Sequence, residues 1–437
     1  MFRNILGTIG IRAINALLTL FIIVLNARCL GAEGVGTISL IILAVTIIQL
    51  LTNLIGGSAV IYMTPRVGVY RLLLPAYMWS ILISFAGAFS MELIGQLIPS
   101  VEIIPNGYLM EVLVLTLVVS LTSVHFMLIL GLEKISTFNW VNLIQITALI
   151  LILIVFYFIN DYRNVMAYFW AYFISYLLTY LITLIRLIPH VKPVPLNGLS
   201  KIIKDLLRFG TYVQVANIFQ QLNYRLSYYL VDFFSGRAAV GILSVGVQVS
   251  EGLWLIGRSI AIVQLSRISN EKDDKYSIRI SLVLMKITWT ITLLALIILL
   301  LVPSFAFQML FGKVFAGIHP LVFSLGFGIV SLSASMILSQ FFSGVNKPFH
   351  NTISSAIGLV ITVGCGLLLI PDLGVIGAGI TATLSYTFAT LYQIIIFIRI
   401  THTEFRELLF TGDDFMQIRK EIQLLIKSPI QILTKKQ

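Results

Sequence analysis

The chain has 437 residues, of which 58% are hydrophobic and only 11% are charged. Soluble domains carry roughly 25% charged residues, so no soluble fold could bury this apolar surface and the bilayer must cover it. The two cysteines, Cys29 and Cys365, offer no disulfide framework or metal spacing. A Walker A motif is missing from the sequence, which excludes ATP hydrolysis by that route. We expect no cofactor and no metal site.

Twelve apolar runs follow one another along the chain, and a membrane-spanning helix needs about 20 such residues. The first six runs cover residues 5–27, 36–63, 72–98, 107–131, 140–159 and 165–188. The next six cover residues 209–233, 238–263, 279–301, 317–341, 350–370 and 375–398. The first run is longer than the core of a signal peptide, so we interpret it as an uncleaved helix. The sequence predicts an all-α integral membrane protein of about twelve transmembrane helices.

The longest internal loop divides these runs into two sets of six and is basic. We therefore predict an N-terminal lobe of six helices over residues 1–190 and a cytoplasmic hinge loop over 191–208. A C-terminal lobe of six helices is expected over residues 209–400. Residues 401–437 are too charged to span the bilayer, and we expect them to form an amphipathic cytoplasmic tail.

The positions of lysine and arginine predict the orientation in the membrane. With both termini in the cytoplasm, 21 of the 29 cations lie on the inner side. Four lie within spans, and four face outward, namely Arg28, Arg163, Arg237 and Lys313. This bias predicts a multi-pass protein of the bacterial inner membrane with cytoplasmic N- and C-termini. It also accounts for the net charge of +11 without any nucleic-acid partner.

The two halves repeat each other at the first connection of each half. Gly31-Ala-Glu-Gly-Val-Gly36-Thr-Ile-Ser39 joins the first two runs, and Gly236-Arg-Ala-Ala-Val-Gly241-Ile-Leu-Ser244 joins the seventh and eighth. The glycines and the serine match at one offset of 205 residues. Each half holds an even number of spans, so the copies are parallel and related by an axis along the membrane normal. The repeat predicts two pseudo-symmetric lobes around a central cleft.

Polar side chains form a stripe along one face of the seventh run. They recur at spacings of three or four residues and comprise Gln214, Asn217, Gln221, Tyr224, Arg225, Tyr228 and Asp232. The first, second and eighth runs carry similar stripes. An ionised side chain at mid-bilayer costs roughly 2.5–3.5 kcal/mol, so we expect the stripes to line a shared water-filled cavity. The alternative is that these groups hydrogen-bond from helix to helix as packing contacts.

The stripes supply the candidate site residues, none of which is catalytic. The candidates for substrate binding are Arg12, Asn15, Gln221, Tyr224, Arg225, Tyr228, Gln248 and Arg258. Glu251 and Asp232 are the candidates for ion coupling. Arg12 and Arg258 lie near the inner face, where snorkelling is an alternative role. Structural ion pairs are the alternative for Arg225 and Glu251, and a solvated helix end is the alternative for Asp232.

Three sequence segments resemble one family of membrane proteins. They are Ala27-Arg-Cys-Leu-Gly-Ala-Glu-Gly-Val-Gly36, the segment from Tyr224 to Gly241, and Ile370-Pro-Asp-Leu-Gly-Val-Ile-Gly-Ala378 followed by Ser385-Tyr386. Over about residues 1–400 the chain resembles the polysaccharide transporters, which include the Wzx-type O-antigen flippases. They belong to the MOP superfamily with the MATE multidrug extruders and the lipid II flippases. Ser227 is a departure, because many members carry an acidic residue there.

The resemblance implies a flippase rather than an enzyme. Its expected cargo is an undecaprenyl-pyrophosphate-linked oligosaccharide, such as an O-antigen unit of lipopolysaccharide or a capsule repeat unit. The cargo would cross from the cytoplasmic to the periplasmic leaflet by alternating access between the lobes. A proton or sodium ion, the lipid bilayer and a polysaccharide polymerase are the other expected partners.

Two alternatives remain from the sequence. An ion-coupled antiporter of drugs or organic cations would have an acid-rich cavity, whereas arginines outnumber acids in these stripes. A membrane-embedded polysaccharide polymerase or ligase would carry a large external loop, whereas the predicted external loops are all short.

Overall fold

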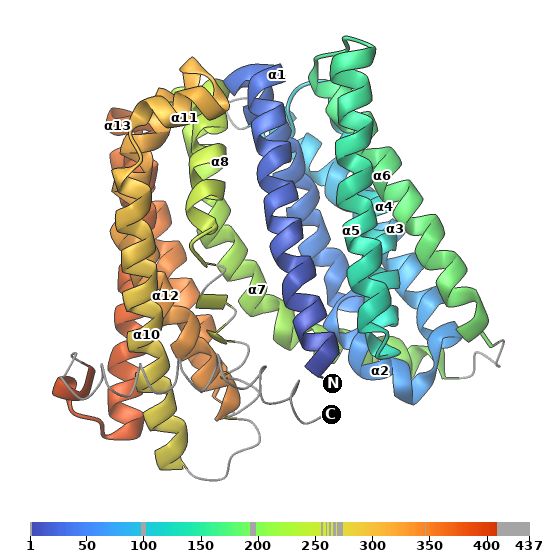
Figure 1. Cartoon of the computed structure of the whole chain (residues 1–437). Coiled ribbons are helices and arrows are strands. Elements are labelled where there is room, and N and C mark those ends of the chain that lie inside the picture. Colours follow the sequence, from blue (N-terminus) through green and yellow to red (C-terminus); the bar gives the residue numbers. More distant parts are fainter. Residues whose placement is uncertain are drawn as a thin grey trace, which may run out of the picture. The chain divides into compact units, whose positions relative to one another are not determined.

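The computed structural model describes residues 2–97, 102–192, 198–254, 274–345 and 347–408, with a few single positions between 257 and 268. Every regular element in these residues is a helix (Figure 1). The first half contains α1 (Phe2–Gly56), α2 (Ser58–Val67), α3 (Val69–Leu97), α4 (Leu109–Gly131), α5 (Ile135–Ile154), η1 (Val155–Ile159), α6 (Val165–Leu187) and η2 (Ile188–His190). The second half contains α7 (Leu199–Ser235), α8 (Arg237–Glu251), α10 (Asp274–Leu301), α11 (Ser304–Phe311), η3 (Lys313–Gly317), α12 (Ile318–Gly344), α13 (Phe349–Thr401) and η4 (Phe405–Leu408).

Eight helical segments of the described chain are long and apolar enough to cross a bilayer. Two of the eight contain a sharp backbone break, at Gly31 in α1 and at Gly374 in α13, so each holds two of the predicted spans. The remaining two predicted spans correspond to α7, which carries many polar side chains, and to α8, which is only 15 residues long. The prediction of an all-α, multi-pass membrane protein is confirmed.

The predicted hinge loop overlaps α7, because this helix begins at Leu199. Lys201, Lys204 and Arg208 therefore lie exposed on the first turns of α7. The predicted tail contains η4, and its residues 409–437 lie outside the described part of the chain. The lobe boundaries stay a prediction.

The first compact unit comprises residues 1–247, 303–321 and 363–378. One of its cores joins α2, α3, α4 and the start of α7, where Leu72, Leu128 and Leu206 are fully buried. Another joins the second half of α1 to α3, α4 and α6 around Ile48 and Val112. These cores fix the second half of α1 against its neighbours, and that segment carries one side of the candidate site.

The second compact unit comprises residues 248–302, 322–362 and 379–437. Its core joins α10, α12 and the second half of α13, and the rings of Phe341 and Phe397 lie edge to face at 4.9 Å. The buried Gln393 amide accepts a hydrogen bond from the Ser335 hydroxyl at 2.7 Å and donates one to Ser339 at 2.9 Å. Polar side chains in this unit thus connect helix to helix.

Candidate functional site

Two sharp corners occupy equivalent places in the two copies of the repeat. The first corner (residues 31–39) begins at Gly31, with φ 68° and ψ −173°. The second corner (residues 236–244) begins at Gly236, with φ 80° and ψ 176°. Only glycine adopts this region readily. The backbone thus confirms the repeat that the sequence predicts at this position.

The two corners pack against each other in a two-fold manner inside the first unit. A Cβ atom on Gly36 would lie 2.0 Å from the carbonyl oxygen of Arg237, and one on Gly241 would lie 1.9 Å from that of Ala32. Gly36 is equivalent to Gly241, and Ala32 is equivalent to Arg237, at the offset of 205 residues. The residue that Gly36 contacts is therefore equivalent to the residue that Gly241 contacts, as in an isologous interface.

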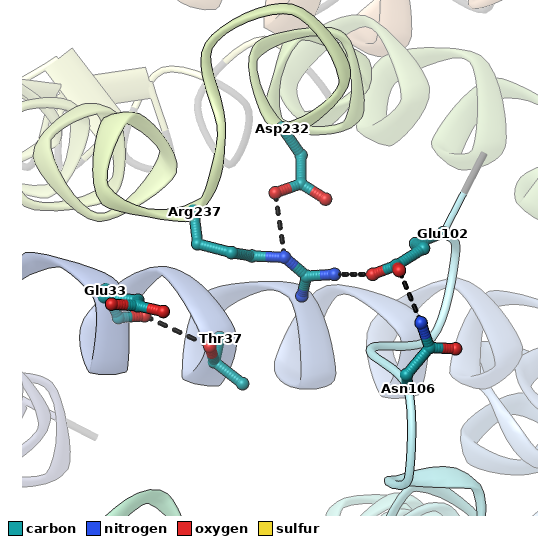
Figure 2. A network of polar contacts seen from close by, with 6 residues as sticks. All are labelled: Glu33, Thr37, Glu102, Asn106, Asp232 and Arg237. Atoms are coloured by element: carbon teal, nitrogen blue, oxygen red, sulfur yellow. Dashed lines mark hydrogen bonds and ion pairs between the residues drawn. The ribbon is translucent and has the colours of Figure 1, made fainter. Parts of the chain in front are cut away.

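Arg237, the first residue of α8, lies between two carboxylates (Figure 2). Its Nε donates to Asp232 Oδ1 at 2.9 Å, and its Nη2 donates to Glu102 Oε2. Asn106 donates to the other oxygen of Glu102 at 2.5 Å, which orients that carboxylate. Asp232 is near the end of α7, whereas Glu102 precedes α4. One guanidinium thus connects the second corner to the first half of the chain.

Arg28 makes a second long-range connection, just before the first corner. Its Nε donates to the carbonyl oxygen of Leu310 at 2.8 Å, and its Nη2 donates to that of Met309. Both carbonyls belong to the last turn of α11, where a helix leaves such groups unsatisfied. Figure 1 shows α11, α8 and the break of α1 at the same end of the first unit.

The inner part of the α7 stripe is used for packing against the second half of α1. The buried Gln214 amide donates to the carbonyl oxygen of Leu50 at 3.0 Å, and Asn217 donates to Gln214 at 2.9 Å. The backbone of Gly210 is so close to α1 that a Cβ atom there would lie 1.8 Å from the carbonyl oxygen of Leu54. Gln214 thus forms a helix-to-helix hydrogen bond, which is the alternative role considered for the stripe.

The middle of the α7 stripe lines a pocket between α7 and the second half of α1. Gln221, Arg225, Tyr229 and Thr46 belong to its lining, although the surface that faces the pocket is apolar. The rest of the lining is aliphatic and consists of Leu43, Ile47, Leu50, Leu222 and Leu226. The space itself is small, about 20 Å³.

Tyr228 fixes the position of the Arg225 side chain. Arg225 Nη1 donates to the Tyr228 hydroxyl at 2.8 Å, and the guanidinium carbon lies 5.4 Å from the ring centroid. Tyr228 is buried, whereas Tyr224 is half-buried and accepts a hydrogen bond from Gln220 at 3.1 Å. Four of the predicted residues, Gln221, Tyr224, Arg225 and Tyr228, are therefore neighbours on one stretch of α7.

Except for Asp232, the other predicted residues belong to other segments of the chain. The Arg12 side chain lies outside the described part of the structure, and Asn15 is half-buried on α1. Gln248 and Glu251 are half-buried and Arg258 is exposed, and all three belong to the second unit. Asp232 forms the ion pair with Arg237 described above. Its role in ion coupling stays a prediction, as do the roles of the others.

Sequence reasoning missed Arg28, Arg237 and Glu102. The sequence nevertheless contained a signal that could have identified the two arginines. Only four cations face the predicted outer side, and two of them adjoin the repeated corners. Glu102 carried no comparable signal, because its contact with Arg237 spans 135 residues of sequence.

The fold is similar to those of known membrane transporters. The lipid II flippase MurJ in an inward closed conformation has a TM-score of 0.76 at 15% identity, over 99% of this chain and 93% of that chain. An inward-facing MATE family multidrug transporter of the MOP superfamily has a TM-score of 0.72 at 15% identity, over 88% and 94% of the chains. The fold is therefore that of MOP superfamily membrane transporters.

Sequence similarity supports the same assignment. The uncharacterized membrane protein MJ1068 of Methanocaldococcus jannaschii is 24% identical over 198 residues, which are 44% of this chain and 39% of that protein. The profile of the polysaccharide biosynthesis protein family matches residues 1–253, more than half of the chain. The chain belongs to the polysaccharide biosynthesis protein family.

Proposed function

We propose that the protein is a flippase for an undecaprenyl-pyrophosphate-linked oligosaccharide, such as an O-antigen or capsule repeat unit. It moves this cargo from the cytoplasmic to the periplasmic leaflet of the bacterial inner membrane by alternating access. The observation that carries the proposal is the position of Arg225, in an otherwise largely aliphatic pocket between two transmembrane segments. The family assignment to polysaccharide biosynthesis supports the class of cargo.

A pyrophosphate group is the part of the cargo that most needs a partner inside the bilayer. Two unit charges 4 Å apart interact with about 1 kcal/mol in water and about 4 kcal/mol at an effective dielectric of 20. A guanidinium also offers two parallel donors to phosphate oxygens. Arg225 therefore offsets part of the cost of moving the pyrophosphate, and Gln221 and Thr46 add neutral hydrogen-bonding groups beside it.

The tyrosines have separate roles in this proposal. Tyr228 is buried and hydrogen-bonded to Arg225, so it positions the guanidinium. Tyr224 is half-buried and supplies a ring for stacking on a sugar face. The leucines of the same pocket suit the hydrocarbon that adjoins the pyrophosphate.

The two copies of the repeat differ at two charged positions, and this difference supports a functional role for the charges. At the offset of 205 residues, Arg225 corresponds to Leu20, and Glu251 corresponds to Thr46. At these two positions the first copy packs its helices with uncharged residues. The charges retained in the second copy therefore need another reason, since each is costly in the bilayer.

The remaining candidates complete the proposed cycle. Arg12, Asn15, Gln248 and Arg258 extend the substrate site, and Glu251 binds the proton or sodium ion that drives transport. Both termini lie in the cytoplasm in this proposal, and a polysaccharide polymerase consumes the flipped product.

The test is the amount of lipid-linked oligosaccharide on the inner leaflet of a strain that lacks this gene. We expect accumulation that wild type and Arg208→Ala relieve and that Arg225→Ala does not. Arg208 is the matched control, because it is an exposed cation on the same helix. Membrane levels of each variant are measured in parallel, so that loss of insertion is separated from loss of transport.

Two outcomes would contradict the proposal. Normal lipid-linked sugar together with raised drug sensitivity would identify an antiporter of organic cations. Flipped but unpolymerised oligosaccharide in the deletion strain would identify a polymerase or ligase.

A further inference from the structure

Two arginines at the corners, Arg28 and Arg237, make long-range contacts outside the pocket. Arg28 precedes the first corner and belongs to the first copy of the repeat. Arg237 lies in the second corner and belongs to the second copy. Each arginine contacts the opposite copy: Arg237 contacts Glu102, and Arg28 contacts the carbonyls of Met309 and Leu310.

The segments that the two arginines contact lie at equivalent positions of the repeat. Glu102 lies in the connection between α3 and α4, which follow the first corner in the first copy. Met309 and Leu310 lie in the connection between α10 and α12, which follow the second corner in the second copy. The residue 205 positions after Glu102 is Phe307, which lies within one helical turn of Met309 and Leu310. The two contacts therefore reach equivalent segments of the two copies, although Arg28 itself precedes Ala32, the equivalent of Arg237, by four residues.

We propose that Arg28 and Arg237 form a paired arginine latch, which holds the two corners together on the predicted periplasmic side. The latch must open on both sides of the axis before cargo leaves toward the periplasm. This inference rests only on the alternating-access part of the proposed function, and it requires no particular cargo.

The two halves of the latch differ in chemistry. Arg237 lies between two carboxylates, and its side chain is 20% exposed, against 11% for Asp232 and 38% for Glu102. Partial burial makes such a pair stronger than one in open water. Arg28 instead meets the negative end of α11 through backbone carbonyls. Side-chain substitution can therefore remove both partners of Arg237. The partners of Arg28 are backbone carbonyls, so only Arg28 itself can be substituted.

Arg163 provides a matched control on the same predicted side of the membrane. It pairs with Asp161 at 3.0 Å, but the two residues are neighbours in sequence and their side chains are 50% and 80% exposed. This local pair joins nothing across the repeat. Its removal changes the net charge as Arg237→Ala does, and its described contacts with Asp161, Tyr157 and Phe158 all lie within the first copy.

Closure of the corners can be measured by a disulfide between positions 39 and 244. The two serine oxygens lie 2.7 Å apart, so cysteines there are near enough for an S–S bond of about 2.0 Å. The native cysteines are first changed, as Cys29→Ser and Cys365→Ser. The cross-linked fraction of membrane-inserted protein is then compared among Ser39→Cys/Ser244→Cys proteins that carry further substitutions.

We expect Arg237→Ala and Arg28→Ala each to lower the cross-linking rate by about twofold or more, the scale of one partly exposed charge pair. The two together lower it further, and Arg163→Ala leaves it unchanged. Glu102→Gln and Asp232→Asn preserve shape and test the same half of the latch if Arg237→Ala does not insert. Equal rates in Glu102→Gln, Arg28→Ala and Arg163→Ala would overturn the latch. No lipid-linked sugar is present in this assay, so its result is independent of the cargo.

Discussion

The hydroxyl of Ser39 donates a hydrogen bond to the hydroxyl of Ser244 at 2.7 Å, and the two serines are 205 residues apart. That separation is the offset of the internal repeat, so each serine contacts its own equivalent. A contact of this kind lies on the pseudo-two-fold axis, because only points on the axis are brought onto themselves. The axis therefore passes between the two corners, next to Gly36 and Gly241.

Adding a methyl group at either packed glycine should destabilise the protein. In Gly36→Ala and Gly241→Ala the new Cβ would lie about 2 Å from a backbone carbonyl oxygen, which has no rotamer with which to move away. We expect a loss of about 1–3 kcal/mol, as for overpacking elsewhere. Thermal unfolding in detergent measures it. Gly364→Ala is the control, because its added carbon would meet no atom outside its own helix backbone within 4 Å, and an equal or slightly higher melting temperature is expected there.

His125 is predicted to stabilise the first unit rather than to carry protons. Its ring is fully buried, its Nδ1 lies 2.7 Å from the Thr183 hydroxyl, and its Nε2 contacts the Tyr77 hydroxyl. His125→Ala removes both hydrogen bonds and leaves the two hydroxyls without their ring partner, at a cost of about 1–3 kcal/mol. The melting temperature should fall, while transport per inserted molecule keeps the wild-type pH profile. A changed pH profile with an unchanged melting temperature would assign His125 to coupling.

Glu251→Gln tests the ion-coupling proposal. The amide keeps the size of the side chain but cannot release a proton or offer a charge to sodium. We expect the variant to lose the dependence of transport on the ion gradient. Initial rates in vesicles with imposed pH or sodium gradients measure this directly. A response equal to that of wild type in both gradients would remove Glu251 from the mechanism.

Arg225→Lys separates charge from geometry at the pocket. Lysine retains the positive charge but lacks the planar fork that matches two phosphate oxygens. We expect transport between the rates of wild type and Arg225→Ala, with a weaker apparent affinity for the lipid-linked sugar. Equal affinity in Arg225→Lys and wild type would show that charge alone suffices.

The sequence predicted the spans and the corners because both depend on local signals. Apolar runs of membrane length and a glycine at each corner specify them without reference to distant residues. The predicted hinge over residues 191–208 overlaps the start of α7, because the charges of Lys201, Lys204 and Arg208 suggested a loop. The i, i+4 pair Ile202 and Leu206 instead buries one face of that segment against the core of α2 to α4, which makes it helical.

The contacts of Arg237 with Glu102 and of Arg28 with α11 were beyond sequence reasoning. They depend on which connection of one copy lies beside the corner of the other, and this follows only from the packed arrangement. The α7 stripe was predicted as one cavity lining, but it serves two purposes. Gln214 packs against α1 and accepts a hydrogen bond from Asn217, whereas Gln221 and Arg225 line a pocket.

The most direct test of the central claim is movement of the cargo by the purified protein in vesicles. Lipid-linked oligosaccharide is placed in one leaflet, and its arrival in the other is followed by enzymatic cleavage from outside. We predict transfer by wild type and by Arg208→Ala, and a rate lower by about tenfold, equivalent to about 1.4 kcal/mol, for Arg225→Ala. Transfer by Arg225→Ala at the wild-type rate would contradict a cationic pocket at this position. No transfer by any of the three proteins would contradict the flippase itself.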